Sequence, residues 1–127
     1  MRFFVYGTLT DRERAGRVVP DASFAGAAAL EGLQRVEARY PTLVPGGSVA
    51  GRILETDYVD RLDAYEGVDR GLYVRVTVPA DGGEGVATYV GRPGRLGVEA
   101  AGWPGDGPFA ERVERWVEEN EVVVQTE

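Results

Sequence analysis

The apolar residues of this chain occur in short runs, and glycines or prolines recur between them. The 127 residues include 18 glycines and 7 prolines, and both residue types destabilise the interior of a helix. Residues 2–6 are largely aromatic or β-branched and stop at Gly7, which predicts a buried strand that leads into a turn. These frequent glycines and prolines limit the chain to strands and short helices.

Alternating or β-branched runs predict further strands over residues 22–36, 48–55, 72–78 and 86–90. The first of these runs is ambiguous between helix and strand. We favour a strand because Gly26 and Gly32 would weaken a helix and are typical of bends at barrel corners. Residues 40–47 contain two prolines and a Gly-Gly pair, which predicts a loop. Residues 122–124 could add a short edge strand.

Three helices are predicted over residues 11–19, 57–66 and 108–120. Thr10 and Thr56 stand where the first two helices need an N-cap. Gly67 suits the position just beyond the second helix, and Pro108 suits the first position of the third. Residues 91–107 are rich in glycine and proline without a period, so we expect an irregular segment there.

Strands with helices inserted at irregular intervals predict an α+β fold with a mixed sheet. The glycine-containing strands favour a small closed or nearly closed mixed β-barrel with flanking helices. The length is that of one ordinary domain, so we expect a single domain over residues 1–127.

The chain contains no cysteine and no histidine, and all 14 of its basic residues are arginine. These absences exclude disulfides, thiol nucleophiles, the Ser-His-Asp triad, Schiff-base lysines and the usual histidine or cysteine zinc sites. We therefore expect neither a metal nor a cofactor. In an enzyme of this composition, Asp, Glu or Tyr must transfer protons, while Arg and backbone N–H groups stabilise charge.

The protein is acidic, with 14 basic and 21 acidic residues and a net charge of -7. This balance argues against nucleic acid and anionic membranes as partners. No apolar run approaches the ~20 residues of a membrane helix, and the apolar N-terminal segment is too short for a signal peptide. We expect a cytoplasmic protein and leave its oligomeric state open.

The turn after the first strand is one candidate site. Backbone N–H groups of Gly7, Thr8 and Leu9 could point outward together and hold a carboxylate or a phosphate. The alternative is an ordinary glycine turn with a capping threonine. If Gly7 has a positive φ, a valine at this position would displace the turn.

The second predicted helix ends in a carboxylate. Tyr58, Leu62 and Tyr65 form its apolar stripe, and Glu66 follows just before Gly67. A glutamate at the negative end of the helix dipole is unfavourable when ionised, and partial burial would raise its pKa toward the range of a general base. The alternative is a solvated surface glutamate. Tyr73 and Tyr89 on the hairpin are a third candidate, with core packing as the alternative.

Six segments, taken in order, resemble the gamma-glutamylcyclotransferase-like family, which includes the avirulence-induced-protein-like small cyclotransferases. They are FVYGTL (4–9), YPTLVP (40–45), VAGRIL (49–54), LDAYEG (62–67), LYVR (72–75) and ATYV (87–90). Each segment alone is unspecific, whereas the ordered set is more specific. The C-terminal third carries no matching motif.

The resemblance implies a small barrel with a cavity at its mouth. It implies that Tyr6, Gly7, Thr8 and Leu9 bind a γ-glutamyl group, that Glu66 is the general acid/base, and that Tyr73 and Tyr89 line the pocket. The family reaction closes 5-oxoproline by attack of the substrate's α-amine on its own γ-carbonyl and expels an amine. It uses no metal, and its substrates include glutathione and γ-glutamyl amines.

A non-catalytic binding module for a carboxylate-bearing metabolite is the alternative function. Glu66 argues against pure binding, because a carboxylate inside an anion pocket weakens affinity for anions. The sequence does not specify the leaving group.

Overall fold

The computed structural model describes residues 1–97 and 103–126. Its centre is one six-stranded sheet with the order β4-β5-β1-β3-β2-β6. The strands are β1 (Arg2–Val5), β2 (Ser23–Val36), β3 (Thr42–Glu55), β4 (Tyr73–Pro79), β5 (Gly85–Gly91) and β6 (Val123–Thr126). β1 is antiparallel to β3 and parallel to β5, so the sheet is mixed.

The sheet curls until its two edges meet at one end. Ala80, directly after β4, forms a parallel bridge with Val124 of β6. The N–H of Asp81 donates to the carbonyl of Val124 at 2.9 Å. The predicted α+β fold with a nearly closed mixed barrel is therefore confirmed, and β6 is the edge strand expected in the tail.

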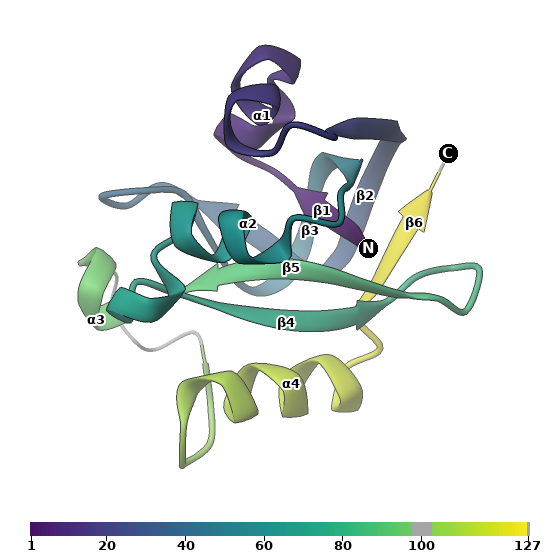
Figure 1. The fold of residues 1–127 in the computed structure, drawn as a ribbon. Coiled ribbons are helices and arrows are strands. Elements are labelled where there is room, and N and C mark those ends of the chain that lie inside the picture. Colours follow the sequence, from purple (N-terminus) through teal and green to yellow (C-terminus); the bar gives the residue numbers. More distant parts are fainter. Residues whose placement is uncertain (98–102, 127) are drawn as a thin grey trace.

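Helices flank the sheet on several sides. They are α1 (Arg12–Val18), α2 (Val59–Tyr65), α3 (Pro93–Leu96) and α4 (Phe109–Glu119), with 3-10 turns η1 (Thr8–Thr10) and η2 (Val68–Arg70). In Figure 1, α2 lies across the β4/β5 hairpin and α4 runs along the other side of β4. The predicted hairpin and three main helices are confirmed, whereas α3 was not predicted, and residues 98–102 of the expected irregular segment lie outside the described residues.

The prediction of a loop over residues 40–47 is wrong, because β3 already begins at Thr42. The partner strand β2 pairs with it along its whole length, and Pro45, Gly46 and Gly47 form an irregularity inside the ladder. Gly46 and Gly47 have φ of +99° and +65°, values that glycine adopts without strain. The proline and the two glycines therefore interrupt the pairing within one strand instead of ending the strand.

All three helix starts differ from the prediction. Tyr58, not Thr56, is the N-cap of α2. Asp11, not Thr10, caps α1, and its carboxylate accepts from the N–H of Glu13 at 3.2 Å. Pro108 is the N-cap of α4 and not its first residue. Gly67 is in the left-handed conformation after α2, as predicted.

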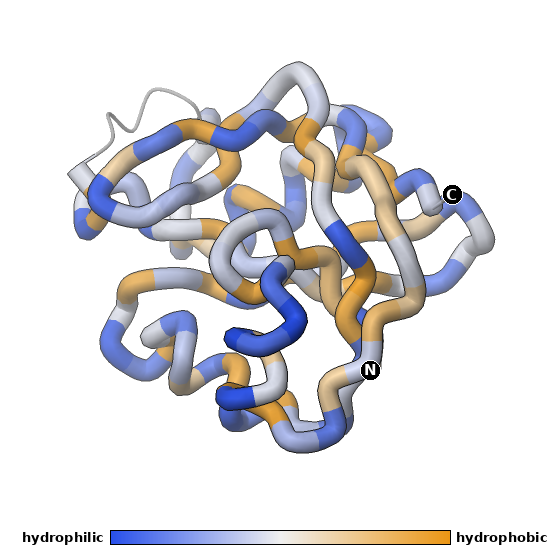
Figure 2. The backbone as a smooth tube through the Cα atoms, turned by 90° about the horizontal axis from the view of Figure 1, so that it is seen from above, coloured by the Kyte–Doolittle hydropathy of each residue, from blue (hydrophilic) through white to orange (hydrophobic). Residues whose placement is uncertain are grey.

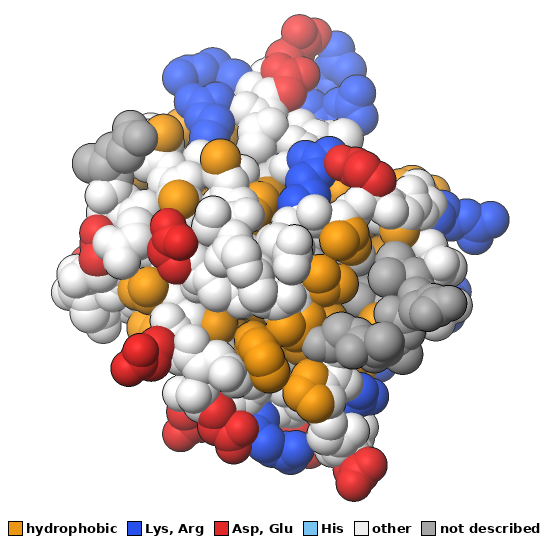
Figure 3. All heavy atoms as spheres, turned by 180° about the vertical axis from the view of Figure 1, so that it is seen from behind, with side chains coloured by type: hydrophobic (Ala, Val, Ile, Leu, Met, Phe, Trp, Pro, Cys, Tyr) orange, Lys and Arg blue, Asp and Glu red, His pale blue; other side chains and the backbone are white. Residues whose placement is uncertain are grey.

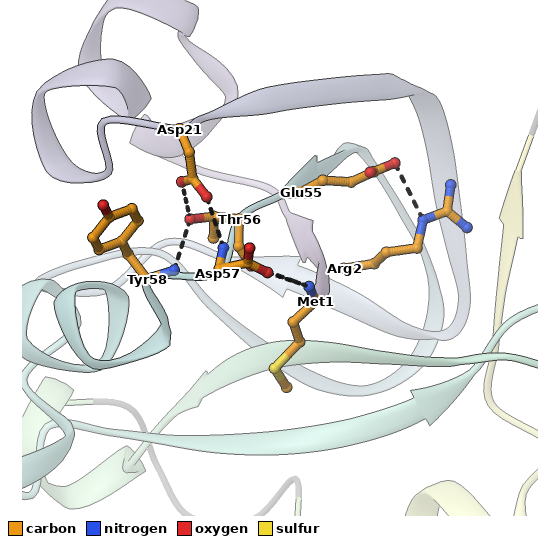
Figure 4. Close-up of polar contacts among 7 residues, drawn as sticks. All are labelled: Met1, Arg2, Asp21, Glu55, Thr56, Asp57 and Tyr58. Atoms are coloured by element: carbon orange, nitrogen blue, oxygen red, sulfur yellow. Dashed lines mark hydrogen bonds and ion pairs between the residues drawn. The ribbon is translucent and has the colours of Figure 1, made fainter.

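Thr56 lies two residues before the N-cap of α2 and belongs to a polar network that fastens the start of this helix (Figure 4). Its hydroxyl donates to Asp21, which follows α1, and accepts from the N–H of Tyr58 at 3.0 Å. The N–H of Asp57 donates to Asp21 at 2.9 Å, and the amino terminus of Met1 donates to the carbonyl of Thr56 at 3.1 Å. The bond from Thr56, helped by that from Asp57, lowers the pKa of Asp21.

The apolar core consists of two clusters. One fills the barrel and the space under α4, and the other lies between the sheet and the helices α1 and α2. Hydrophobic and hydrophilic stretches alternate along the backbone (Figure 2). On the far face, charged side chains surround a central group of hydrophobic ones (Figure 3). Within the described ranges, no helix is long and apolar enough to cross a membrane.

At Gly51 of β3, the neighbouring strand β1 lies too close to leave room for a side chain. A Cβ at this position would lie 2.3 Å from the carbonyl oxygen of Val5 and 2.7 Å from the ring of Phe4. We expect Gly51→Ala to lower the free energy of unfolding by about 1–3 kcal/mol, measured in urea. Gly16→Ala is the control, because nothing lies within 4 Å of its added Cβ and a helical alanine stabilises by about 0.5–1 kcal/mol. Equal stability of the two variants would contradict this packing.

Candidate active site

A cavity of about 340 Å³ opens where β1 ends, beside the end of α2. Four chain segments and one strand residue surround it. The lining residues are Phe4–Leu9 with Arg14, Tyr40 with Pro41, Tyr65 with Glu66, Arg70 with Leu72 and Tyr73, and Tyr89. The seven candidate residues from the sequence, Tyr6, Gly7, Thr8, Leu9, Glu66, Tyr73 and Tyr89, therefore line one cavity.

The turn after β1 lines this cavity and carries unused backbone donors. The N–H groups of Gly7, Thr8 and Leu9 donate to no acceptor among the described residues. The turn is held from behind, because the carbonyl of Gly7 accepts from the hydroxyl of Thr10 at 2.7 Å. The carbonyl of Tyr6 accepts from Arg35 at 2.6 Å. Three consecutive donors on a braced turn form a setting for an anionic group.

The condition of a positive φ at Gly7, under which a valine would displace the turn, is not met. Its φ is -126°, and nothing lies within 4 Å of a Cβ added there. A valine at this position would act by taking up space, not by straining the backbone.

Glu66 is the C-cap of α2. Its N–H donates to the carbonyl of Leu62 at 2.9 Å, and the chain then reverses at Gly67 with φ of +68°. The residue is half-buried, and its carboxylate accepts no hydrogen bond from the described residues. Desolvation raises the pKa of Glu66 from 4.5 to about 7. A carboxyl group with this pKa can both take up and return a proton near neutral pH.

Asp63 ties α2 to both strands of the hairpin. It accepts from the hydroxyl of Tyr89 at 2.7 Å and pairs with Arg75 at 2.8 Å. The ring of Tyr89 stacks on Phe3, with 6.0 Å between centroids. These contacts hold the helix that carries Glu66 against the sheet.

The two hairpin tyrosines line the cavity and use their hydroxyls within the protein. The hydroxyl of Tyr73 donates to the carbonyl of Pro41 at 2.5 Å, and that of Tyr89 donates to Asp63. Burial raises the pKa of both phenols above the ordinary value. Tyr6 behaves in the same way: its hydroxyl donates to the carbonyl of Tyr89 at 2.6 Å, and burial raises its pKa. These three tyrosines are therefore neutral near pH 7.

Several residues that line the cavity were not predicted from the sequence. Tyr65 was assigned to an apolar stripe, but it is exposed at the cavity and its hydroxyl lies 2.8 Å from the hydroxyl of Thr8. Tyr58 of the same stripe is exposed as well, and only Leu62 is fully buried. Arg14 and Arg70 carry no local pattern that separates them from surface arginines. In the part of the chain that the structure describes, no group of three acidic residues could hold a metal ion.

The raised pKa of Glu66 predicts a pH dependence of stability. Between pH 4.5 and 7 the unfolded chain loses this proton while the folded protein keeps it, so stability falls as pH rises. Relative to Glu66→Gln, the wild-type protein should lose up to about 3 kcal/mol between pH 4.5 and pH 8. Denaturant unfolding at several pH values measures this difference. A difference that does not change with pH would contradict the desolvated carboxyl.

Comparison with solved structures finds the same fold. A protein described as "Gamma-glutamyl cyclotransferase" is similar with a TM-score of 0.60 at 19% identity, covering 94% of this chain and 99% of its own. An uncharacterized protein from Homo sapiens is similar with a TM-score of 0.62 at 20% identity, covering 92% and 97%. A protein from Arabidopsis thaliana solved in solution has a TM-score of 0.55 at 29% identity, covering 94% and 84%.

The search of curated proteins found no match. The family model described as "Gamma-glutamyl cyclotransferase, AIG2-like" matches residues 3–104. This match spans most of the chain and contains every candidate site residue. The chain therefore belongs to the gamma-glutamyl cyclotransferase, AIG2-like family.

Proposed function

We propose that this protein is a γ-glutamyl cyclotransferase or γ-glutamylamine cyclotransferase with Glu66 as its general acid/base. The observation that carries the proposal is a desolvated carboxyl group with a pKa of about 7 in the same cavity as three unused N–H groups. The substrate is a small molecule with a γ-glutamyl group. The family membership supports this reaction class.

The reaction needs one proton carrier and no nucleophile from the protein. The substrate's α-amine is an ammonium ion near neutral pH, and ionised Glu66 takes its proton. The freed nitrogen attacks the γ-carbonyl carbon and closes a five-membered lactam, while the bond from this carbon to the leaving nitrogen breaks. Protonated Glu66 then returns the proton to the leaving nitrogen, and the second proton that the ring nitrogen must lose passes to the leaving amine by the same route. 5-Oxoproline and the protonated amine form, with no net proton change.

The cavity supplies the geometry for this ring closure. An extended glutamyl chain keeps its amine and γ-carbonyl apart, and binding in a folded form brings them to about 3–3.5 Å. Such positioning contributes on the order of 7–11 kcal/mol against an unoriented reaction. The N–H groups of Gly7, Thr8 and Leu9 would receive an anionic part of the substrate, either its α-carboxylate or the oxyanion. The rings of Tyr73 and Tyr89 would form apolar walls beside the folded chain.

The first test is release of 5-oxoproline from glutathione, γ-glutamyl amino acids and γ-glutamyl amines. We expect Glu66→Gln to bind substrate but to lower turnover by roughly 10²–10⁴-fold. Glu119→Gln on α4 is the matched control, because this exposed residue lies away from the cavity. Wild-type turnover in folded Glu66→Gln would remove Glu66 from the mechanism. Ligand binding without product in the wild-type protein would favour a binding module.

The pH profile is the second test. Because Glu66 must be ionised to accept the proton, kcat/KM should rise with pH and level off above an apparent pKa of about 7. This rise of kcat/KM with pH should be absent from the residual activity of Glu66→Gln. A rise centred near pH 4.5 in the wild-type protein would mean that the acid/base group is not desolvated.

A further inference from the structure

Two positive charges line the cavity besides the residues used above. Arg14 of α1 and Arg70 of η2 both belong to its wall, and both side chains are exposed. Among the described residues, neither guanidinium forms an ion pair or donates a hydrogen bond. In a protein with a net charge of -7, two arginines without carboxylate partners at one cavity form a local positive region.

Arg70 lies on the Glu66 side of the cavity. Its Nη2 is 2.9 Å, and its Nε 3.3 Å, from the position that a Cβ on Gly67 would take. The guanidinium is therefore folded back over the residue that follows Glu66. It does not pair with Glu66, whose pKa is raised by desolvation. Its backbone is held in place, because the carbonyl of Arg70 accepts from Arg95 at 3.0 Å.

This placement bears on the leaving group, and the inference rests on the proposed function. Glu66 would return its proton to the leaving nitrogen, so that nitrogen lies next to Glu66 in the bound substrate. In a γ-glutamyl amino acid, the carboxylate of the leaving amino acid is two bonds from this nitrogen. A guanidinium over Gly67, the next residue in the chain after Glu66, can donate two parallel hydrogen bonds to such a carboxylate.

We propose that Arg70 is a specificity-determining residue that selects substrates whose leaving group carries a carboxylate next to the leaving nitrogen. The favoured substrates are then γ-glutamyl amino acids or peptides of that kind, and not γ-glutamyl derivatives of simple amines. The donors of the Gly7–Leu9 turn remain for the glutamyl part, which all these substrates share.

A matched pair of ligands isolates this carboxylate. γ-Glutamylalanine and γ-glutamylethylamide differ only in the leaving group's carboxylate. Binding of each to Glu66→Gln by isothermal titration calorimetry reports recognition without turnover. We expect γ-glutamylalanine to bind about 10–100-fold more tightly, the value of a charge-assisted hydrogen-bonded pair.

Adding Arg70→Gln to this background should reduce the affinity ratio to about 1, and Arg70→Lys should restore part of it. Arg115→Gln, an equal charge change on α4, is the control and should keep the ratio. Thermal unfolding checks that each variant is folded. An equal affinity for the two ligands before Arg70 is changed would overturn the inference, as would a ratio that survives Arg70→Gln and is lost in Arg14→Gln.

The same ligands separate this inference from the proposed function. Selective binding of γ-glutamylalanine with no release of 5-oxoproline by the wild-type protein would contradict the cyclotransferase and leave the role of Arg70 standing. Release of 5-oxoproline from both ligands at equal kcat/KM would support the cyclotransferase and contradict the role of Arg70. Binding of neither ligand would overturn both.

Discussion

The site depends on the contact between Asp63 and the β4/β5 hairpin. This carboxylate holds Tyr89 at 2.7 Å and Arg75 at 2.8 Å, so one side chain of α2 fastens the helix to both strands. α2 has only seven residues and would not be stable alone. Its position, and with it the position of Glu66 three residues later, therefore comes from tertiary contacts at both ends: Asp63 here and the Asp21–Thr56 network at its start.

The placement of Glu66 has an energetic cost. A carboxyl group with a pKa of about 7 is destabilising when ionised, and the described residues offer it no compensating hydrogen bond. The hydroxyls of Tyr6, Tyr73 and Tyr89, in contrast, donate hydrogen bonds inside the protein. Among the described residues, the cavity thus combines three hydrogen-bonded tyrosines with one carboxyl group and three N–H groups that have no partner. Such a contrast concentrates reactivity on few atoms.

The sequence predicted those features whose signals are local. The hairpin followed from alternation, Gly67 from helix-capping rules, and the turn at Gly7 from the end of an apolar run. The strand through Pro45, Gly46 and Gly47 could not be predicted, because its pairing comes from β2. Grouping of the candidate residues around one cavity rested on the family resemblance. Arg70 was missed because only the tertiary fold brings it over Gly67.

Isotope labelling tests the central claim, intramolecular attack by the substrate's own amine, most directly. The protein is incubated with γ-glutamylalanine in water enriched in ¹⁸O, and the masses of the products are measured by mass spectrometry. The account predicts 5-oxoproline without ¹⁸O, because no water enters the bond that forms. Glutamate carrying one ¹⁸O would show hydrolysis and would contradict the account, and so would the absence of 5-oxoproline.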